Sequence, residues 1–272
     1  MYDEYPDLIY EGLKIELYDL DITTESFNIK DKVNRVISYI RKLIEKIISK
    51  VKNLFAKDKS NNKSEHAIEE LIKKYNPVVS TLPLNYEKVI EFLNWLDEAI
   101  SSVEKNHEEM KEMVIKTLKE YMNSGDENSF TDYFIQLSTN LKSSESHKKI
   151  YEFNETIFRD KAEDFQRKYI DYKVTITDIK PVQKINELIK NKNIMTKMDK
   201  IKKEVESISK ENYDVSNLNI PEKYRQNVKE SYENIKFGTI NDLKSLLITL
   251  NDIIEFTEII SKVLNDPQKY HK

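Results

Sequence analysis

The chain has 272 residues, of which 34% are charged and 39% hydrophobic, and its formal net charge is −4. This composition is too apolar for a wholly disordered chain and is ordinary for a helical globular protein. It has no cysteine, which excludes disulfide frameworks and thiolate metal sites. Its three glycines are too few for the tight turns of a sheet protein or for a glycine-rich phosphate loop.

Residues 1–27 form an acidic segment without sustained hydrophobic periodicity. They carry eight acids against Lys14 alone, a net charge of −7. No positively charged region is followed by an apolar run here, so we expect no secretory signal peptide. The pattern predicts an N-terminal arm that is extended or only partly ordered.

Residues 28–57 have the opposite charge, with nine bases against two acids and a net charge of +7. Apolar residues recur every three or four positions from Ile29 to Phe55, which predicts an amphipathic helix of about eight turns. The bases opposite this apolar stripe form a candidate basic interaction face, comprising Lys32, Arg35, Lys42, Lys46, Lys50 and Lys52.

Four interpretations of this helix remain open. It contacts nucleic acid, lies on an anionic membrane, packs on a helix of a partner protein, or completes the bundle of its own chain while its bases pair with the acidic arm. The apolar stripe is wide and continuous, so each interpretation must shelter it from water.

Residues 58–64 are predicted to be a polar linker and domain boundary, and residues 65–272 a helical bundle domain. Asn76-Pro77 stops one helix, Pro181 suits the first position of another, and Thr239 after Gly238 suits an N-cap. The predicted helices span residues 65–75, 86–122, 130–141, 146–172, 181–210, 221–235 and 240–264.

The fold class expected from this order is all-α: an elongated bundle of long antiparallel helices. The β-branched, partly alternating residues 173–180 predict one short strand or extended link. No run of 18 apolar residues occurs, so no membrane-spanning helix is expected.

Catalytic and metal-binding patterns are weak. Glu104 and His107 have the Glu-x-x-His spacing of di-iron bundles, but no second copy exists, so we interpret them as part of a solvated helix face. A zinc-protease pattern starting at His107 would need histidine where Lys111 stands. Trp95 is expected in the core. We predict no catalytic, cofactor-binding or metal residue, no cofactor and no small-molecule substrate.

The N-terminal layout resembles internal and structural virion proteins of large tailed bacteriophages. The similarity lies in an acidic leader ending near Glu25-Ser26-Phe27, followed by the basic amphipathic helix. It implies that a head-maturation protease removes the leader after glutamate. The candidate processing residues are Glu11, Gly12, Glu25 and Ser26; the residues before Glu11 match the protease preference, whereas Thr23 stands where an apolar residue is expected before Glu25.

Removing residues 1–25 would delete seven net negative charges and change the net charge from −4 to +3. A positive product lies beside packaged DNA more readily than its precursor. The expected function is therefore a non-enzymatic virion protein that acts through assembly or packaging contacts with protein partners, in the virion or the host cytoplasm. The alternatives are a helical module that inhibits a host factor and a membrane-surface protein that uses residues 29–57.

Overall fold

The computed structural model describes residues 29–58, 64–124, 145–157, 169–212, 214 and 222–271. Within these ranges the protein is a helical bundle with one two-stranded sheet, which confirms the predicted fold class. The elements are α2 (Ile29–Asp58), α3 (Glu65–Tyr75), β1 (Val78–Thr81), α4 (Tyr86–Ser124), α6 (Glu145–Thr156), β2 (Ile170–Lys173), η1 (Ile176–Asp178), α7 (Ile179–Asn191), α8 (Ile194–Lys210), α9 (Glu222–Asn265) and η2 (Pro267–Tyr270).

Several predictions fall outside the described residues. They are the acidic arm 1–27, residues 59–63 of the predicted linker, the helix 130–141, and the candidate processing residues Glu11, Gly12, Glu25 and Ser26.

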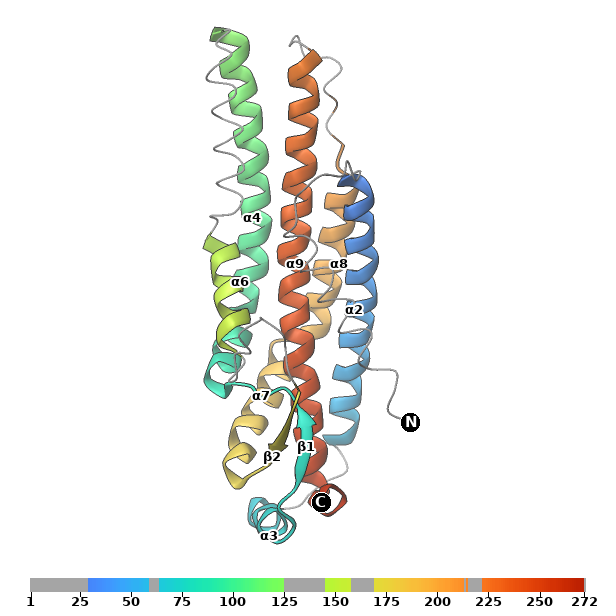
Figure 1. Cartoon of the computed structure of the whole chain (residues 1–272), viewed down its shortest axis with the longest axis vertical. Helices are drawn as coiled ribbons and strands as arrows, with labels where there is room; N and C mark the ends of the chain where they lie inside the picture. Colours follow the sequence, from blue (N-terminus) through green and yellow to red (C-terminus); the bar gives the residue numbers. More distant parts are fainter. Residues whose placement is uncertain are drawn as a thin grey trace.

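Helix α9 forms the long axis of the bundle, with α2 and α8 on one side and α4 and α6 on the other (Figure 1). Its buried side chains lie around nearly its whole circumference, as expected for a central helix; they include Leu243, Ile248, Leu250, Ile254, Phe256 and Ile260. The sheet, α3 and η2 cover the end of the bundle where the C-terminus lies.

The bundle combines both helix directions. Helix α4 runs antiparallel to α9, since Tyr86 at its start contacts Phe256 with ring centroids 5.8 Å apart. Helix α2 runs parallel to α9, and Lys50 near its end pairs with Glu255. An element near the start of the chain is thereby packed beside one near its end.

The apolar stripe of α2 is buried in the core of the chain itself. Its residues from Val33 to Leu54 belong to the same hydrophobic cluster as side chains of α4, α7, α8 and α9, and Ile40 and Ile47 are 0% exposed. Each such side chain contributes about 1.5–3 kcal/mol through burial. The structure therefore shows that the apolar face of α2 completes its own bundle, as the last of the four interpretations expects, whereas the pairing of its bases with the acidic arm lies outside the described residues.

Helices α3 and α4 begin where the sequence predicts. The Ser64 side chain accepts a hydrogen bond from the Ala67 amide and caps α3, while Asn76 ends that helix in the left-handed conformation. Trp95 lies in the core and stacks on Phe153, with ring centroids 5.1 Å apart, as predicted.

The predicted helix 146–172 is wrong in its last turn, and the strand predicted at 173–180 is misplaced. Helix α6 ends at Thr156, and Ile170–Lys173 form β2, which pairs antiparallel with the unpredicted strand β1. Residues 176–178 form the 3₁₀ turn η1 instead, because the Asp178 carboxylate accepts from the amide and hydroxyl of Thr175.

The predicted helix 181–210 is two helices. Asn193 has φ 47° and ψ 57°, a left-handed conformation that asparagine tolerates better than most residues, and it separates α7 from α8. Pro181 is the third residue of α7 rather than the first. In the first turn its missing N–H would have had no partner within the helix anyway.

The predicted interruption at Gly238 and Thr239 is also wrong, since α9 continues through both residues. Glycine costs a helix only about 1 kcal/mol relative to alanine. The neighbouring side chains of Ile235 and Ile240 are both fully buried, so packing on either side outweighs that cost. The Thr239 hydroxyl donates to the Ile235 carbonyl at 2.9 Å instead of capping a new helix.

Candidate functional site

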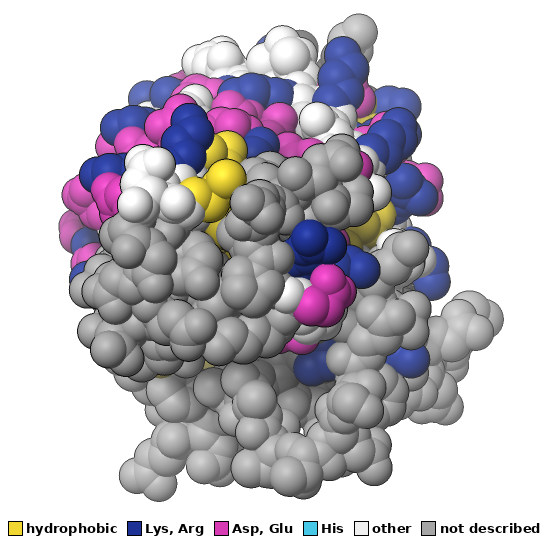
Figure 2. Space-filling model, turned by 90° about the horizontal axis from the view of Figure 1, so that it is seen from above, with side chains coloured by type: hydrophobic (Ala, Val, Ile, Leu, Met, Phe, Trp, Pro, Cys, Tyr) yellow, Lys and Arg dark blue, Asp and Glu magenta, His cyan; other side chains and the backbone are white. Residues whose placement is uncertain are grey.

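The outer surface of α2 is the candidate functional surface. We define it as the exposed described side chains of this helix: Lys32, Asn34, Arg35, Ser38, Arg41, Lys42, Glu45, Ser49, Lys52 and Asn53. Five are basic and one is acidic. In the view from above, Lys and Arg side chains lie along the edge of the molecule on the side of α2 and α8, and others lie among Asp and Glu side chains along the opposite edge (Figure 2).

The residues predicted to form the basic face divide into two groups. Lys32, Arg35, Lys42 and Lys52 are exposed, and among the described residues none of them forms an ion pair. Lys46 and Lys50 instead face α9, where both contact Glu255. Arg41 was not predicted but is exposed, and it lies 3.7 Å from Glu206 of α8.

Lys50 and Glu255 hold α2 against α9. The Lys50 ammonium donates to Glu255 and to Asn251 Oδ1 (3.1 Å), and the Tyr169 hydroxyl donates to Glu255 Oε1 at 3.0 Å. The side chains of Lys50 and Glu255 are only 13% and 18% exposed, respectively. Burial lowers the pKa of Lys50. Burial opposes the charge of Glu255, but Lys50 outweighs it and lowers the pKa of that carboxyl.

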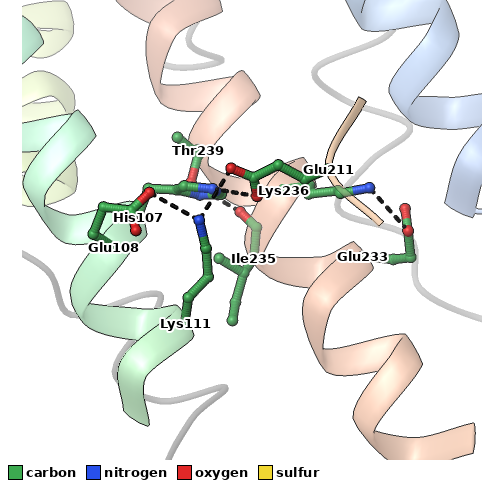
Figure 3. A network of polar contacts seen from close by, with 8 residues as sticks. All are labelled: His107, Glu108, Lys111, Glu211, Glu233, Ile235, Lys236 and Thr239. Carbon is green, nitrogen blue, oxygen red and sulfur yellow. Dashed lines mark hydrogen bonds and ion pairs between the residues drawn. The ribbon is translucent and has the colours of Figure 1, made fainter. Parts of the chain in front are cut away.

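A buried polar network joins α4 to α9 (Figure 3). His107 is 1% exposed. Its Nδ1 lies 2.9 Å from Thr239 Oγ1 and its Nε2 lies 3.0 Å from Glu211 Oε2. The interpretation of Glu104 and His107 as a solvated helix face is therefore wrong for His107, because its ring is buried and bonded to Thr239 and Glu211. Glu104 is half-buried and pairs with Lys200 at 2.9 Å.

The hydrogen bonds of this network indicate the proton positions on His107. The Thr239 hydroxyl donates its only proton to the Ile235 carbonyl, so it accepts from Nδ1–H. The Glu211 carboxylate can only accept, so Nε2 also donates. Both ring nitrogens of His107 are therefore engaged in hydrogen bonds within the network.

Among the described residues, His107, Glu108 and Glu211 bring their ligand atoms within 4.8 Å of one another, close enough to hold a metal ion. The Lys111 ammonium already donates to both carboxylates, at 2.8 Å to Glu108 and 3.0 Å to Glu211. Burial opposes the charge of Glu211, but the hydrogen bonds from His107 and Lys111 lower its pKa. The Lys111 ammonium thus lies between the two carboxylates, and we assign the network to holding helices together.

An open pocket of about 400 Å³ lies beside β2 and η1. The Asp178 carboxylate in its wall is 3% exposed and accepts from the hydroxyls of Tyr86 and Tyr172, both at 2.7 Å. Burial raises the pKa of Tyr86, so this phenol stays protonated and donating. Because Thr175 also donates to Asp178, the carboxylate is fully engaged in stabilising the turn.

His147 and Asp242 connect α6 to α9 with 2.6 Å between Nδ1 and Oδ1. The hydrogen bond to Asp242 raises the pKa of His147, and burial raises the pKa of Asp242.

We predict that this pair makes stability depend on pH. A raised pKa in the folded protein stabilises it below the pKa of the unfolded chain, and this contribution is lost as the pH rises through the folded value. Urea midpoints between about pH 6 and 8 should therefore fall more steeply for the wild type than for His147→Asn. His147 is about half exposed, so its contribution to the free energy of unfolding should change by less than about 1 kcal/mol over this pH range. Identical pH profiles would contradict the prediction.

Comparison of the chain with protein-family models, curated proteins and solved structures found no match. In the described ranges, every helix is too short or too polar to cross a membrane.

Proposed function

We propose that this protein is a non-enzymatic structural component of a tailed-bacteriophage particle and that it contacts packaged DNA through the outer surface of α2. The observation that carries the proposal is the contrast between the two sides of this helix. Its apolar stripe is buried in the core of the bundle, while five basic side chains and a single acidic one are exposed on the opposite side.

The way α2 is held supports contact with a polyanion. The Lys50–Glu255 pair and the Arg41–Glu206 pair connect it to α9 and α8. The exposed bases therefore project from a fixed scaffold, and a phosphate backbone can meet them without first ordering the helix. Each phosphate that a base neutralises also releases counterions, which makes such binding depend on salt.

The competing interpretations have less support. Insertion into a membrane surface requires an apolar helix face directed outward, and the face available on α2 is occupied by the bundle. Inhibition of a host factor predicts that the protein co-purifies with one host protein. It does not predict the salt-dependent DNA binding that is tested below.

The assignment to a phage particle rests on the resemblance of residues 9–57 to virion proteins. Mass spectrometry of purified particles should detect the chain with an N-terminus at Gly12 or Ser26. Absence of the protein from particles would refute this part of the proposal, whereas an intact N-terminus would refute only the processing.

The DNA contact predicts a specific loss. Replacing Arg35, Lys42 and Lys52 by glutamine should weaken binding to duplex DNA at least tenfold at about 50 mM salt. The slope of log K against log salt should fall by about 0.9 for each lost phosphate contact. Fluorescence anisotropy of labelled DNA measures both quantities with the full chain.

The matched control replaces three exposed α4 lysines, Lys105, Lys116 and Lys119, by glutamine and so changes the net charge equally. It should bind DNA nearly as the wild type does. Equal losses in the two triple variants, or no binding by the wild type, would refute the DNA contact.

A further inference from the structure

The strongest unexplained feature of the described surface is an excess of positive charge on α2 with nothing described opposite most of it. Of the five exposed bases, only Arg41 has a carboxylate partner among the described residues. The same chain carries its largest excess of negative charge in residues 1–25, immediately before this helix.

We propose that residues 1–25 occupy the outer surface of α2 and compete with DNA for it. This inference rests on the proposed function for its consequence, but not for the intramolecular contact itself. The acidic segment is thus an internal inhibitor, and the contact is electrostatic.

The charges match in sign and in approximate size. Residues 1–25 contain eight acids and one lysine, while the outer surface of α2 has five bases and one acid. The surface of α4 offers a poorer match, because Lys105 and Lys116 already lie within 4 Å of Glu109 and Glu120, which leaves less uncompensated charge there.

The segment is also long enough and is attached at the right place. Only three residues separate it from Ile29, the first residue of α2. At about 3.3 Å per residue an extended chain of this length spans about 80 Å. The 30 residues of α2 rise about 45 Å. Residues 1–25 can therefore double back along the whole helix and reach Lys52 near its far end.

Attachment at one end gives the segment a local concentration in the millimolar range. Weak individual ion pairs, each contributing about 0.2–1 kcal/mol, then suffice together to weaken the binding of a free polyanion at low salt without abolishing it. The screening length falls to about 8 Å at physiological salt, so the inhibition should decline as salt rises.

The contact is tested first without DNA. Carbodiimide coupling joins a carboxylate to a lysine only when the two touch, and mass spectrometry identifies the joined residues. In the full chain, carboxylates of residues 1–25 should couple to Lys42 and Lys52 more often than to Lys202 and Lys203. These control lysines are exposed on α8, about one turn from Glu206, the residue that faces Arg41.

The competition is tested with a full-length variant in which the acids of residues 1–25 are neutralised. Its substitutions are Asp3→Asn, Glu4→Gln, Asp7→Asn, Glu11→Gln, Glu16→Gln, Asp19→Asn, Asp21→Asn and Glu25→Gln. It should bind duplex DNA at least tenfold more tightly than the wild type at about 50 mM salt, and the difference should shrink as salt rises. Adding Arg35→Gln, Lys42→Gln and Lys52→Gln to this variant should abolish the gain.

The outcomes separate this inference from the DNA contact. Equal coupling to the α2 and α8 lysines, with equal DNA affinity of the wild type and the neutralised variant, overturns the inhibition and leaves the DNA contact standing. Preferential coupling to α2 with no DNA binding by either protein supports the intramolecular contact and refutes DNA as the competitor. A gain that persists without Arg35, Lys42 and Lys52 shows general charge repulsion and overturns the inference.

Discussion

Replacing Ile47 by alanine is expected to lower the free energy of unfolding by about 2–5 kcal/mol. Ile47 lies at the centre of the α2 stripe and is 0% exposed. Its truncation leaves a cavity between α2 and its neighbours that a rigid bundle fills only in part. Urea unfolding followed by circular dichroism measures the loss.

The control for this prediction is Ser49→Ala, two residues further along on the exposed side of the same helix. Its effect should stay within about 0.5 kcal/mol. If Ile47→Ala lowers the free energy of unfolding no more than Ser49→Ala does, then α2 does not pack on the bundle. The proposal that its bases face outward from the bundle would then be refuted.

Breaking the Lys50–Glu255 pair is expected to have the second large effect. Glu255→Leu leaves the Lys50 ammonium largely buried without its carboxylate, and removal of one partner of a buried pair costs about 3–5 kcal/mol. Because 13% of the Lys50 side chain and 18% of the Glu255 side chain remain exposed, we expect about 2–3 kcal/mol.

A second substitution in the same background makes this test specific. Lys50→Met removes the stranded charge, so the double variant should recover most of the stability lost in Glu255→Leu. Glu109→Gln breaks the exposed pair with Lys105 and should cost less than about 0.5 kcal/mol. Strictly additive effects of the Lys50 and Glu255 substitutions would show that the two side chains are not coupled.

The helices that the sequence predicted well are those with a strong local signal. Helix α2 has a long uninterrupted stripe, and α3 lies between a serine cap and Asn76-Pro77. These signals lie within a few residues of one another and need no knowledge of the rest of the fold.

The errors in the predicted helices and strands arise where contacts between residues far apart in the sequence determine the structure. Helix α9 passes through Gly238 because neighbouring helices bury both sides of it, and that burial is invisible in the local pattern. Strands β1 and β2 have four residues each and stand about ninety positions apart. A two-stranded sheet of this kind is defined by its pairing rather than by either segment alone.

The buried position of His107 did have a signal in the sequence. It lies four residues after Val103 and three before Met110, which places it directly on the apolar stripe of α4. Its partner Glu211 had none, because that residue follows the last turn of α8 without periodic spacing. Likewise, helical periodicity placed Lys50 on the polar side of α2 but could not show that Glu255 lies opposite.

The parallel pairing of α2 with α9 has a consequence for how the protein is made. The isoleucine-rich face of α2 leaves the ribosome before the helix that covers it, because α9 is synthesised about two hundred residues later. During that interval the apolar face is exposed on an incomplete chain, and chaperones bind exposed apolar surfaces of this kind. Nascent chains that stop before α9 should therefore aggregate or be degraded rather than persist as partial bundles.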